Sequence, residues 1–298
     1  MTDAWDRLAP SREQRTGETG DLWHRALIDP SVRRLIGSVQ GLRVLELACG
    51  NGYLARLLAG QGAREVVGID RSAVFVRLAR ARERRASRGV RFERADATRL
   101  PFAAGSFDLV VANMALMDIR NARGAVREAA RVLGPRGRLV FSIGHPCFDL
   151  DDRSTWQIER GFDAKGVYRD TVYRKVRGYR EERATRVPWH VGPGAVLWTP
   201  SYHRTLSTYS RYLADAGFAI ARLEEPSPLP PMLLGSPQGR YIAEIPLHLV
   251  VEAVRLDDRP TVASRTTVRT RRVGGRRSGS GGRTARSGSV RRGSTSAA

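Results

Sequence analysis

Residues 42–56 read LRVLELACGNGYLAR, and the fold can be worked out from this stretch. It begins as a short run of Leu and Val, typical of a buried strand, and passes through a glycine-rich turn into the helical spacing of LARLLA at 54–59. Glycine lets the backbone approach a ligand closely, and the free N–H groups at the start of the helix favour an anion. The stretch therefore predicts a ligand-binding turn at the edge of a sheet.

Strands and helices alternate along the rest of the chain. Buried or alternating apolar runs predict strands at 42–48, 64–70, 90–96, 107–113, 138–144, 218–225 and 245–254. Helical spacing and capping residues predict helices at 31–37, 72–87, 122–133 and 204–216. This alternation predicts an α/β fold, with a doubly wound, Rossmann-like, mostly parallel seven-stranded sheet and helices on both faces.

Three segments are expected to lie outside this regular pattern. Residues 1–40 are predicted to form an N-terminal helical cap segment, and residues 148–200, rich in Arg, aromatics, Gly and Pro, an inserted cap within the main domain at 41–258. Residues 259–298 contain eleven Arg, no acid and no aromatic residue, and are mostly Arg, Gly, Ser and Thr. Such a composition cannot bury enough apolar surface to offset its ordering entropy, so a disordered tail is expected.

The composition excludes several classes of protein. With 298 residues and 41% hydrophobic residues, the chain has enough apolar surface for a core. No run approaches the roughly 18 apolar residues of a membrane span, and the opening MTDAWDRLAP lacks a signal-peptide core. The two cysteines, Cys49 and Cys147, form neither a disulfide framework nor a zinc motif. A cytoplasmic protein with no metal site and no membrane partner is expected.

The net charge of +21 is divided between the two parts of the chain. The segment 259–298 carries +11 and residues 1–258 carry +10. A basic protein of this kind could contact nucleic acid non-specifically, chiefly through the tail. Arginine outnumbers lysine throughout, which weakens the case that each arginine was selected for a contact.

Acidic residues lie at or near the ends of three consecutive predicted strands. Glu46 lies just before the glycine-rich turn, Asp70 ends the second strand, and Asp96 ends the third. A carboxylate at a strand end can accept hydrogen bonds from ribose hydroxyls, and Glu46 would suit a cationic ligand. Together the three acids suit a ligand that has an adenosine and a positive charge. The spacing of Gly50, Gly52 and Ala55 also satisfies the dinucleotide fingerprint, so a nicotinamide cofactor remains an alternative.

This constellation resembles the class I S-adenosylmethionine-dependent methyltransferases, specifically the methyltransferase type 11 group. The resemblance is strong over 41–144 and weaker over 218–254, and four stretches carry it: VLELACGNGYLARLLAG, VVGID, ADATRLPFAAGSFDLVVANMAL and the strand ending in SIGHPCF. Ala48 stands where the family usually has the first glycine of its motif. The resemblance implies that 41–258 is a class I methyltransferase domain and that S-adenosylmethionine is the cofactor.

The resemblance also implies a role for each matching residue. Glu46 would hold the methionine amino group, while Gly50 and Gly52 would make room for the ligand. Asp70 would bind the ribose hydroxyls, and Asp96 with the N–H of Ala97 would bind adenine. The backbone of Asn113 and Met114 would face the methionine end.

The methyl acceptor must be inferred from the site and not from the fold. His145 follows the fifth strand at the ligand edge and is the candidate catalytic base. Trp23, His24, Tyr202 and His203 are candidates for the acceptor pocket. Cys147 is a weak candidate nucleophile, because the Pro-Cys of pyrimidine C5 enzymes ends the fourth strand, where this chain has Asn113 and Met114.

These residues predict methyl transfer to O or N of a small-molecule acceptor. RNA or another nucleic acid is the alternative acceptor, suggested by the charge. An NAD(P)-dependent oxidoreductase or a non-catalytic ligand-binding module are further alternatives.

Overall fold

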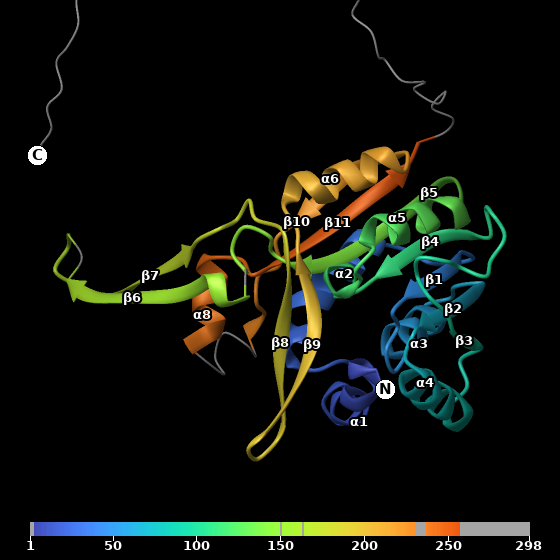
Figure 1. Ribbon diagram of the computed structural model, residues 1–298, viewed down its shortest axis with the longest axis horizontal. Coiled ribbons are helices and arrows are strands. Elements are labelled where there is room, and N and C mark those ends of the chain that lie inside the picture. The colour runs from blue at the N-terminus through green and yellow to red at the C-terminus, as the bar shows by residue number, and fades with distance from the viewer. Residues whose placement is uncertain (1–2, 150, 163, 231–236, 257–298) are drawn as a thin grey trace, which may run out of the picture. The chain divides into compact units, whose positions relative to one another are not determined.

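The computed structural model of the chain describes residues 3–149, 151–162, 164–230 and 237–256. The predicted tail at 259–298 therefore lies outside the described residues. The centre is a seven-stranded sheet (Figure 1). Its strands, in spatial order, are β10 (Phe218–Glu224), β11 (His248–Arg255), β5 (Leu133–Gly144), β4 (Phe107–Ala112), β1 (Arg43–Leu47), β2 (Glu65–Asp70) and β3 (Val90–Arg94).

The sheet is mostly parallel, as predicted from the sequence. Strands β5, β4, β1, β2 and β3 run parallel to one another, whereas β11 is antiparallel to β5 and β10 is antiparallel to β11. The chain starts at β1 in the middle of the sheet, builds outward to β3, and then crosses back to β4. That reversal between β1 and β4 is the switch point at which doubly wound sheets open a crevice for ligands.

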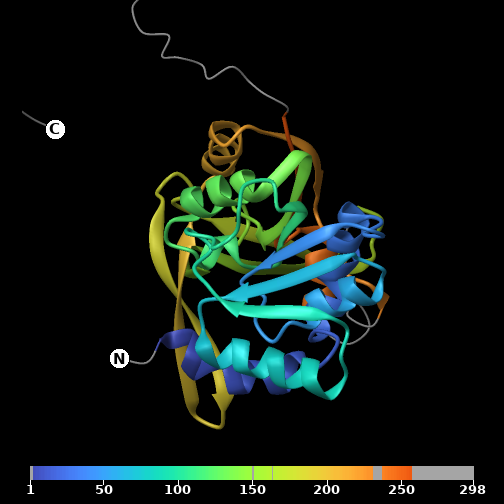
Figure 2. The same ribbon diagram turned by 90° about the vertical axis from the view of Figure 1, so that its right-hand side faces the viewer.

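Helices cover both faces of the sheet (Figure 2). The helices are α1 (Ala4–Thr16), η1 (His24–Ile28), α2 (Asp29–Ile36), α3 (Tyr53–Gly60), α4 (Ala73–Arg85), η2 (Leu116–Asp118), α5 (Ala122–Val132), η3 (Asp151–Arg153), α6 (Leu206–Asp215) and α8 (Pro237–Glu244). The predicted helices at 31–37, 72–87, 122–133 and 204–216 correspond to α2, α4, α5 and α6.

Alternate residues of the central strands pack on opposite faces, each against its own set of helices. Leu45 of β1 and Val67 of β2 pack with α5 and α6, whereas Val44 and Val66 pack with η1, α2, α3 and α4. Side chains alternate across a strand, and a parallel sheet covered on both faces is apolar on both. This explains why 42–48 is almost continuously hydrophobic.

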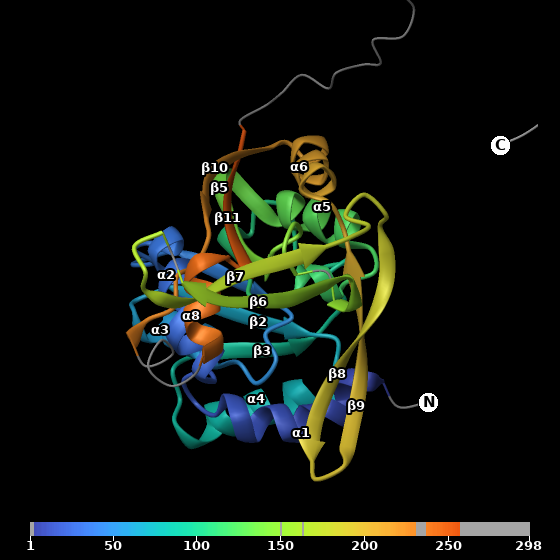
Figure 3. The ribbon, with the colours of Figure 1, turned by 90° about the vertical axis from the view of Figure 1, so that its left-hand side faces the viewer.

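The inserted segment forms two antiparallel hairpins. One consists of β6 (Ser154–Phe162) and β7 (Tyr168–Val176), and the other of β8 (Arg183–Gly192) and β9 (Ala195–His203). The β6–β7 hairpin extends away from the central sheet (Figure 1), while the β8–β9 hairpin runs alongside α1, and α1 lies beside α4 (Figure 3). The sequence predicted an insertion here but not its strands.

None of the described helices is both long and apolar enough to span a membrane.

Candidate active site

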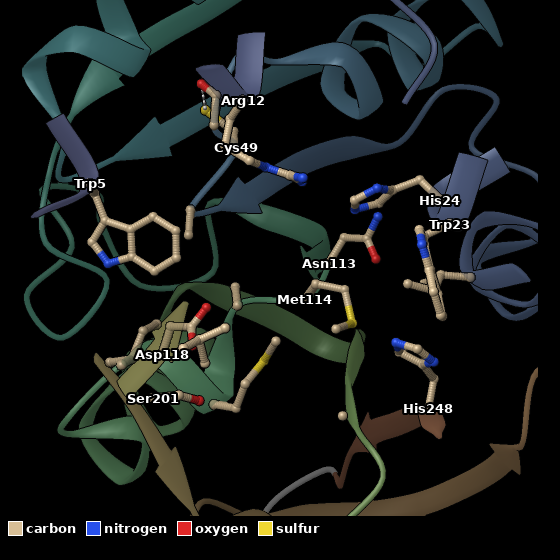
Figure 4. A pocket seen from close by; sticks show the side chains of 18 of the residues that line it. Trp5, Arg12, Trp23, His24, Cys49, Asn113, Met114, Asp118, Ser201 and His248 are labelled. Atoms are coloured by element: carbon tan, nitrogen blue, oxygen red, sulfur yellow. Dashed lines mark hydrogen bonds between the residues drawn. The ribbon is translucent and has the colours of Figure 1, made fainter. Parts of the chain in front are cut away.

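A cavity of about 590 Å³ lies at the carboxyl ends of the central parallel strands. This size falls within the roughly 300–1,000 Å³ of typical small-molecule sites. The ends of β1, β2, β4 and β5 form its floor, and α1, η1, the β8–β9 hairpin and the start of β11 complete its walls. Trp5, Arg12, Trp23, His24, Asn113 and His248 are among the side chains around it (Figure 4). The cavity lies where the strand order reverses.

The turn after β1 contributes backbone to the cavity. Ala48, Cys49 and Gly50 line it, and both Ala48 (φ +52°) and Gly50 (φ +54°) are in the left-handed region. Gly52 does not line the cavity. Its φ is +76°, and a Cβ there would lie 2.3 Å from the ring of Phe92, so glycine is required at this position by the packing of the turn.

Glu46 is buried on the cavity wall without a cationic partner in the described part of the chain. Its carboxylate accepts a hydrogen bond from the backbone N–H of Ala55 at 2.9 Å, and 3% of the residue is exposed. Burial raises the pKa of Glu46 to about 8, the hydrogen bond from Ala55 opposes this rise, and the charges of Asp29 and Asp70 add to it. A buried carboxyl group with a raised pKa and no cationic partner favours a ligand that brings a positive charge.

Asp70 ends β2 on the same cavity. One carboxylate oxygen accepts from the backbone N–H of Gly50 at 3.0 Å, and the other from that of Ser72 at 2.8 Å. Burial raises the pKa of Asp70 to about 6 despite these two hydrogen bonds. Each carboxylate oxygen has two acceptor sites, so capacity remains for two hydroxyl donors from a ligand.

Asp96 and Ala97 are placed differently from the expectation. Neither lines the cavity. Asp96 is exposed, and its Oδ1 accepts from the backbone N–H and the hydroxyl of Thr98, both at 2.8 Å. The carboxylate thus closes a local turn after β3, at the edge of the sheet, and its expected contact with adenine stays a prediction.

Asn113 and Met114 line the cavity above a buried polar network. The Asn113 amide nitrogen donates to Asp29 at 3.1 Å and to the Tyr53 hydroxyl at 2.9 Å, while the Ser142 hydroxyl donates to the Asn113 oxygen at 2.5 Å. Ser142 in turn accepts from the backbone N–H of Met114 at 2.8 Å. The end of β4 is therefore held rigidly against the starts of α2 and α3.

The four residues predicted for the acceptor pocket, Trp23, His24, Tyr202 and His203, all line the cavity. The Nε2 of His203 is engaged by the carbonyl of Tyr179 at 2.7 Å, and the Tyr202 hydroxyl accepts from Arg120 at 3.3 Å. The ring of His24 points into the cavity beside Asn113 (Figure 4).

The structure does not place His145 on the cavity wall, although its neighbours Gly144 and Pro146 line it. The Nε2 of His145 lies 3.0 Å from a carboxylate oxygen of Glu225, and its Nδ1 accepts from the backbone N–H of Cys147 at 3.2 Å. Burial lowers the pKa of His145, and Glu225 opposes the shift. Both ring nitrogens are engaged by groups of the chain, and this placement does not favour the catalytic role expected for His145.

The cysteines and possible metal ligands can be placed from the same geometry. Cys49 is buried and its pKa lies well above the usual value because of burial, which fits a packing residue. Among the described residues, no group of three His, Cys, Asp or Glu gathers in a way that would hold a metal ion.

Several cavity residues were not found from the sequence. Trp5 and Arg12 come from α1, Asp21 from the loop before η1, Trp189 from β8 and His248 from β11. The first three lie within the predicted cap at 1–40, but no motif marks them. Their convergence depends on how α1 and the β8–β9 hairpin pack, which no local pattern specifies.

The sequence and the fold both match known methyltransferases. Residues 45–141 match the family model described as "Methyltransferase domain". The chain is 41% identical over 121 residues to a demethylmenaquinone methyltransferase of Beutenbergia cavernae, covering 41% of this chain and 46% of that protein. It is 35% identical over 145 residues to O-methyltransferase cnsE of Penicillium expansum, covering 47% and 51%. The chain thus spans about half the length of these curated relatives.

A solved structure extends the match beyond residues 45–141. The S-adenosylmethionine-dependent methyltransferase of Mesorhizobium loti aligns with a TM-score of 0.59 and 29% identity, covering 76% of this chain and 96% of that one.

Proposed function

Because this chain belongs to the class I S-adenosylmethionine-dependent methyltransferases, we propose that it transfers a methyl group from S-adenosylmethionine to a small organic molecule. The observation that carries the proposal is the pair of buried carboxylates, Glu46 and Asp70, which end adjacent parallel strands on one cavity. Glu46 has no cationic partner in the described residues, and Asp70 retains free acceptor sites.

The residues present fit the proposed cofactor. Glu46 would hold the methionine ammonium, whose positive charge would restore the ionised carboxylate. Asp70 would accept from the two ribose hydroxyls, and Gly50 would let the ligand lie against the backbone beside the ring of Phe75. The turn at Asn113 and Met114 would face the methionine end. Asp96 and Ala97, which lie outside the cavity wall, are not needed for this fit.

The cofactor, when bound, supplies a methyl group already activated on a sulfonium. The chain therefore has mainly to align donor and acceptor, and such positioning can contribute about 7–11 kcal/mol to lowering the barrier. The rigid network at Asn113, Asp29 and Tyr53 and the aromatic walls from Trp5, Trp23 and Trp189 would provide that alignment.

A small acceptor fits the cavity better than a polymer does. The walls from α1 and the β8–β9 hairpin cover the strand ends, and their lining side chains include Trp5, Trp189 and Tyr202.

The methylated atom is a separate question, and we propose O or N. Since one relative is named for demethylmenaquinone and another as an O-methyltransferase, product analysis should include carbon as well. The proposed catalytic domain comprises 41–258, with caps at 1–40 and 148–200.

The test measures transfer of labelled methyl groups from S-adenosylmethionine into two extracts. One contains only small molecules, and the other is a whole-cell extract assayed with and without nuclease treatment. We expect label in small molecules and no effect of nuclease. Asp70→Ala, which removes two hydrogen bonds of about 0.5–1.5 kcal/mol each, should weaken cofactor binding about 10-fold or more. The matched control Asp215→Ala removes an exposed acid on α6 and should leave binding unchanged. Label found only in nuclease-sensitive material would contradict a small-molecule acceptor.

A further inference from the structure

His24 is held in one orientation by an acid on the wall of the cavity. The Nδ1 of His24 lies 2.8 Å from Oδ1 of Asp21, and the backbone N–H of His24 donates to the same oxygen at 3.1 Å. Asp21 is itself fixed by Arg12, whose guanidinium donates to Oδ2 at 3.0 Å. Burial opposes ionisation of Asp21, but the hydrogen bond and charge of His24 outweigh it and its pKa is lowered. An ionised carboxylate only accepts, so Nδ1 carries the proton and Nε2 presents a lone pair.

The free nitrogen of this ring is available to a ligand. The imidazole points toward the centre of the cavity beside Asn113 (Figure 4), and it contacts the ring of Tyr53 edge-on with centroids 5.6 Å apart. Within the described ranges, Nε2 of His24 has no hydrogen-bond partner, while Asn113 and Tyr53 are already engaged with Asp29. An orienting acid on one nitrogen and an open site at the other are the two features required of a histidine base.

Trp23, His248 and Met114 form the adjacent wall. The rings of Trp23 and His248 lie 5.9 Å apart, and the side chain of Met114 lies close to them (Figure 4). Burial, with smaller contributions from His24 and His145, lowers the pKa of His248 to about 4, so this ring is neutral at physiological pH. Its buried Nδ1 has no partner in the part of the chain that the structure describes. Trp23, Met114 and the neutral His248 ring carry no charge, so this part of the cavity suits an uncharged aromatic ring that can pack against the indole of Trp23.

We propose that His24, oriented by Asp21, is the base that accepts the proton of a hydroxyl group on a flat, uncharged aromatic acceptor. This inference rests on the proposed methyl transfer. The hydroxyl oxygen forms the new bond to the methyl carbon, the carbon–sulfur bond breaks with its electron pair passing to sulfur, and the hydroxyl proton passes to Nε2. The positive charge therefore moves from the sulfonium to the imidazolium, where Asp21 stabilises it.

Charged and titratable groups surround His24. Besides Asp21, it is near Asp29 of α2, Tyr53 of α3, Arg12 of α1 and His248 of β11. Asp21→Asn removes the negative charge beside the imidazolium that the step forms, so this variant should lower the naphthol rate.

The experiment compares two probes with the same ring, 2-naphthol and naphthalene-2-thiol, in the full chain with labelled S-adenosylmethionine. The aryl thiol is far more acidic and reacts as its anion without a base, whereas naphthol must lose its proton during attack. His24→Asn should lower the naphthol rate by about 10²-fold or more and leave the thiol rate within about threefold. His190→Asn is the matched control, since His190 is exposed on β8 and does not line the cavity.

Each other outcome has a definite meaning. If His24→Asn lowers both rates equally, His24 only shapes the cavity and the base assignment is overturned. If wild type binds S-adenosylhomocysteine by calorimetry but does not methylate naphthol, the aromatic hydroxyl is the wrong acceptor class. If wild type does not bind S-adenosylhomocysteine, the proposed function itself fails, and this arm distinguishes the two failures.

Discussion

Two buried carboxyl groups mark the site before any ligand is present. Glu46 and Asp70 have pKa values of about 8 and about 6, both raised chiefly by burial. A folded-state pKa above the unfolded value means that the native state resists ionisation, so the cost to stability grows as pH rises from the unfolded pKa to the folded one. Ionising these carboxyl groups thus costs free energy that a cationic ligand would offset. Raised pKa values of this kind are typical of a binding site.

Ala48 offers a test of the turn itself. It has a φ of +52°, a conformation that an L-residue adopts at a cost, and its methyl group lies on the cavity wall. Ala48→Gly should raise the free energy of unfolding by up to ~1 kcal/mol, because relief of the left-handed strain outweighs the added freedom of the unfolded chain. Urea denaturation measures this change.

The control for that prediction is the same substitution within the following helix. Ala55 is fully buried in α3, where Ala→Gly should lower stability by about 1 kcal/mol or more. If Ala48→Gly were also destabilising, the left-handed strain at position 48 would not be the dominant effect.

Residues at strand ends were the easiest part of the site to predict. Glu46 and Asp70 follow strands whose apolar runs are unmistakable, and parallel strands bring their carboxyl ends to one edge. Asp96 follows an equally clear strand, but its side chain is used by Thr98 in a local turn. His24 was predicted for the acceptor pocket, yet its partner Asp21 was not, because the pairing depends on the loop conformation before η1.

At the scale of elements, the floor of the cavity could be predicted from the sequence, whereas its walls could not. The floor consists of strands with strong buried patterns. The β8–β9 hairpin has an alternating burial pattern that the sequence reflects only weakly, since polar Thr185 and Thr199 lie on the buried face and Trp198 lies exposed. Its position beside α1 is set by contacts such as the edge-on pair of Trp5 and Trp189, with centroids 6.5 Å apart. Such contacts between distant segments leave no local signal.

The attachment of α2 to the sheet depends on one buried acid. Glu252 of β11 accepts from Arg138 at 3.0 Å and from Arg222 at 2.6 Å, and these two arginines also donate to the last carbonyls of α2, at Leu35 and Ile36. Burial alone would raise the pKa of Glu252, but hydrogen bonds from Arg222 and Arg138 outweigh it and lower the pKa. Glu252 therefore holds both guanidinium groups against the helix end.

Glu252→Gln should lower the free energy of unfolding by about 1–3 kcal/mol at neutral pH, because a charged acceptor is lost from a buried cluster. Since the folded-state pKa is lowered, this contribution is present above the unfolded pKa and disappears as pH falls through the folded one. Denaturation of both proteins at neutral and at acidic pH should show the difference shrinking. Glu244→Gln, at an exposed position on α8, is the control. If Glu252→Gln and the unchanged protein differed equally in stability at both pH values, the charge of Glu252 would not be the cause.

At the scale of the whole molecule, the predicted α/β fold and its mostly parallel seven-stranded sheet are confirmed. The assignment to the class I methyltransferases is likewise confirmed. The tail at 259–298 stays a prediction. Its charge of +11 is about half of the total, so conclusions about partners depend on what this segment does.

A chain ending at Asp258 should fold, bind S-adenosylhomocysteine and methylate a small acceptor as the full chain does. The tail has no apolar periodicity for docking, and its arginines repel one another. The full chain should bind nucleic acid more tightly than the shortened one, with affinity falling steeply as salt rises. Activity assays and binding titrations at two salt concentrations check both points. Loss of small-acceptor activity in the shortened chain would show that the boundary is wrong.

The most direct test of the central claim is calorimetric titration of S-adenosylhomocysteine at about pH 7.5, in Tris and in phosphate. A group with a pKa of about 8 is mostly protonated there, and its pairing with the ligand ammonium should release its proton to the buffer. We expect one ligand per chain and no binding of NAD. The heat should be more exothermic in Tris than in phosphate, and Glu46→Gln should abolish most of that difference. Binding of NAD in place of S-adenosylhomocysteine, or a heat that is the same in both buffers, would contradict the account.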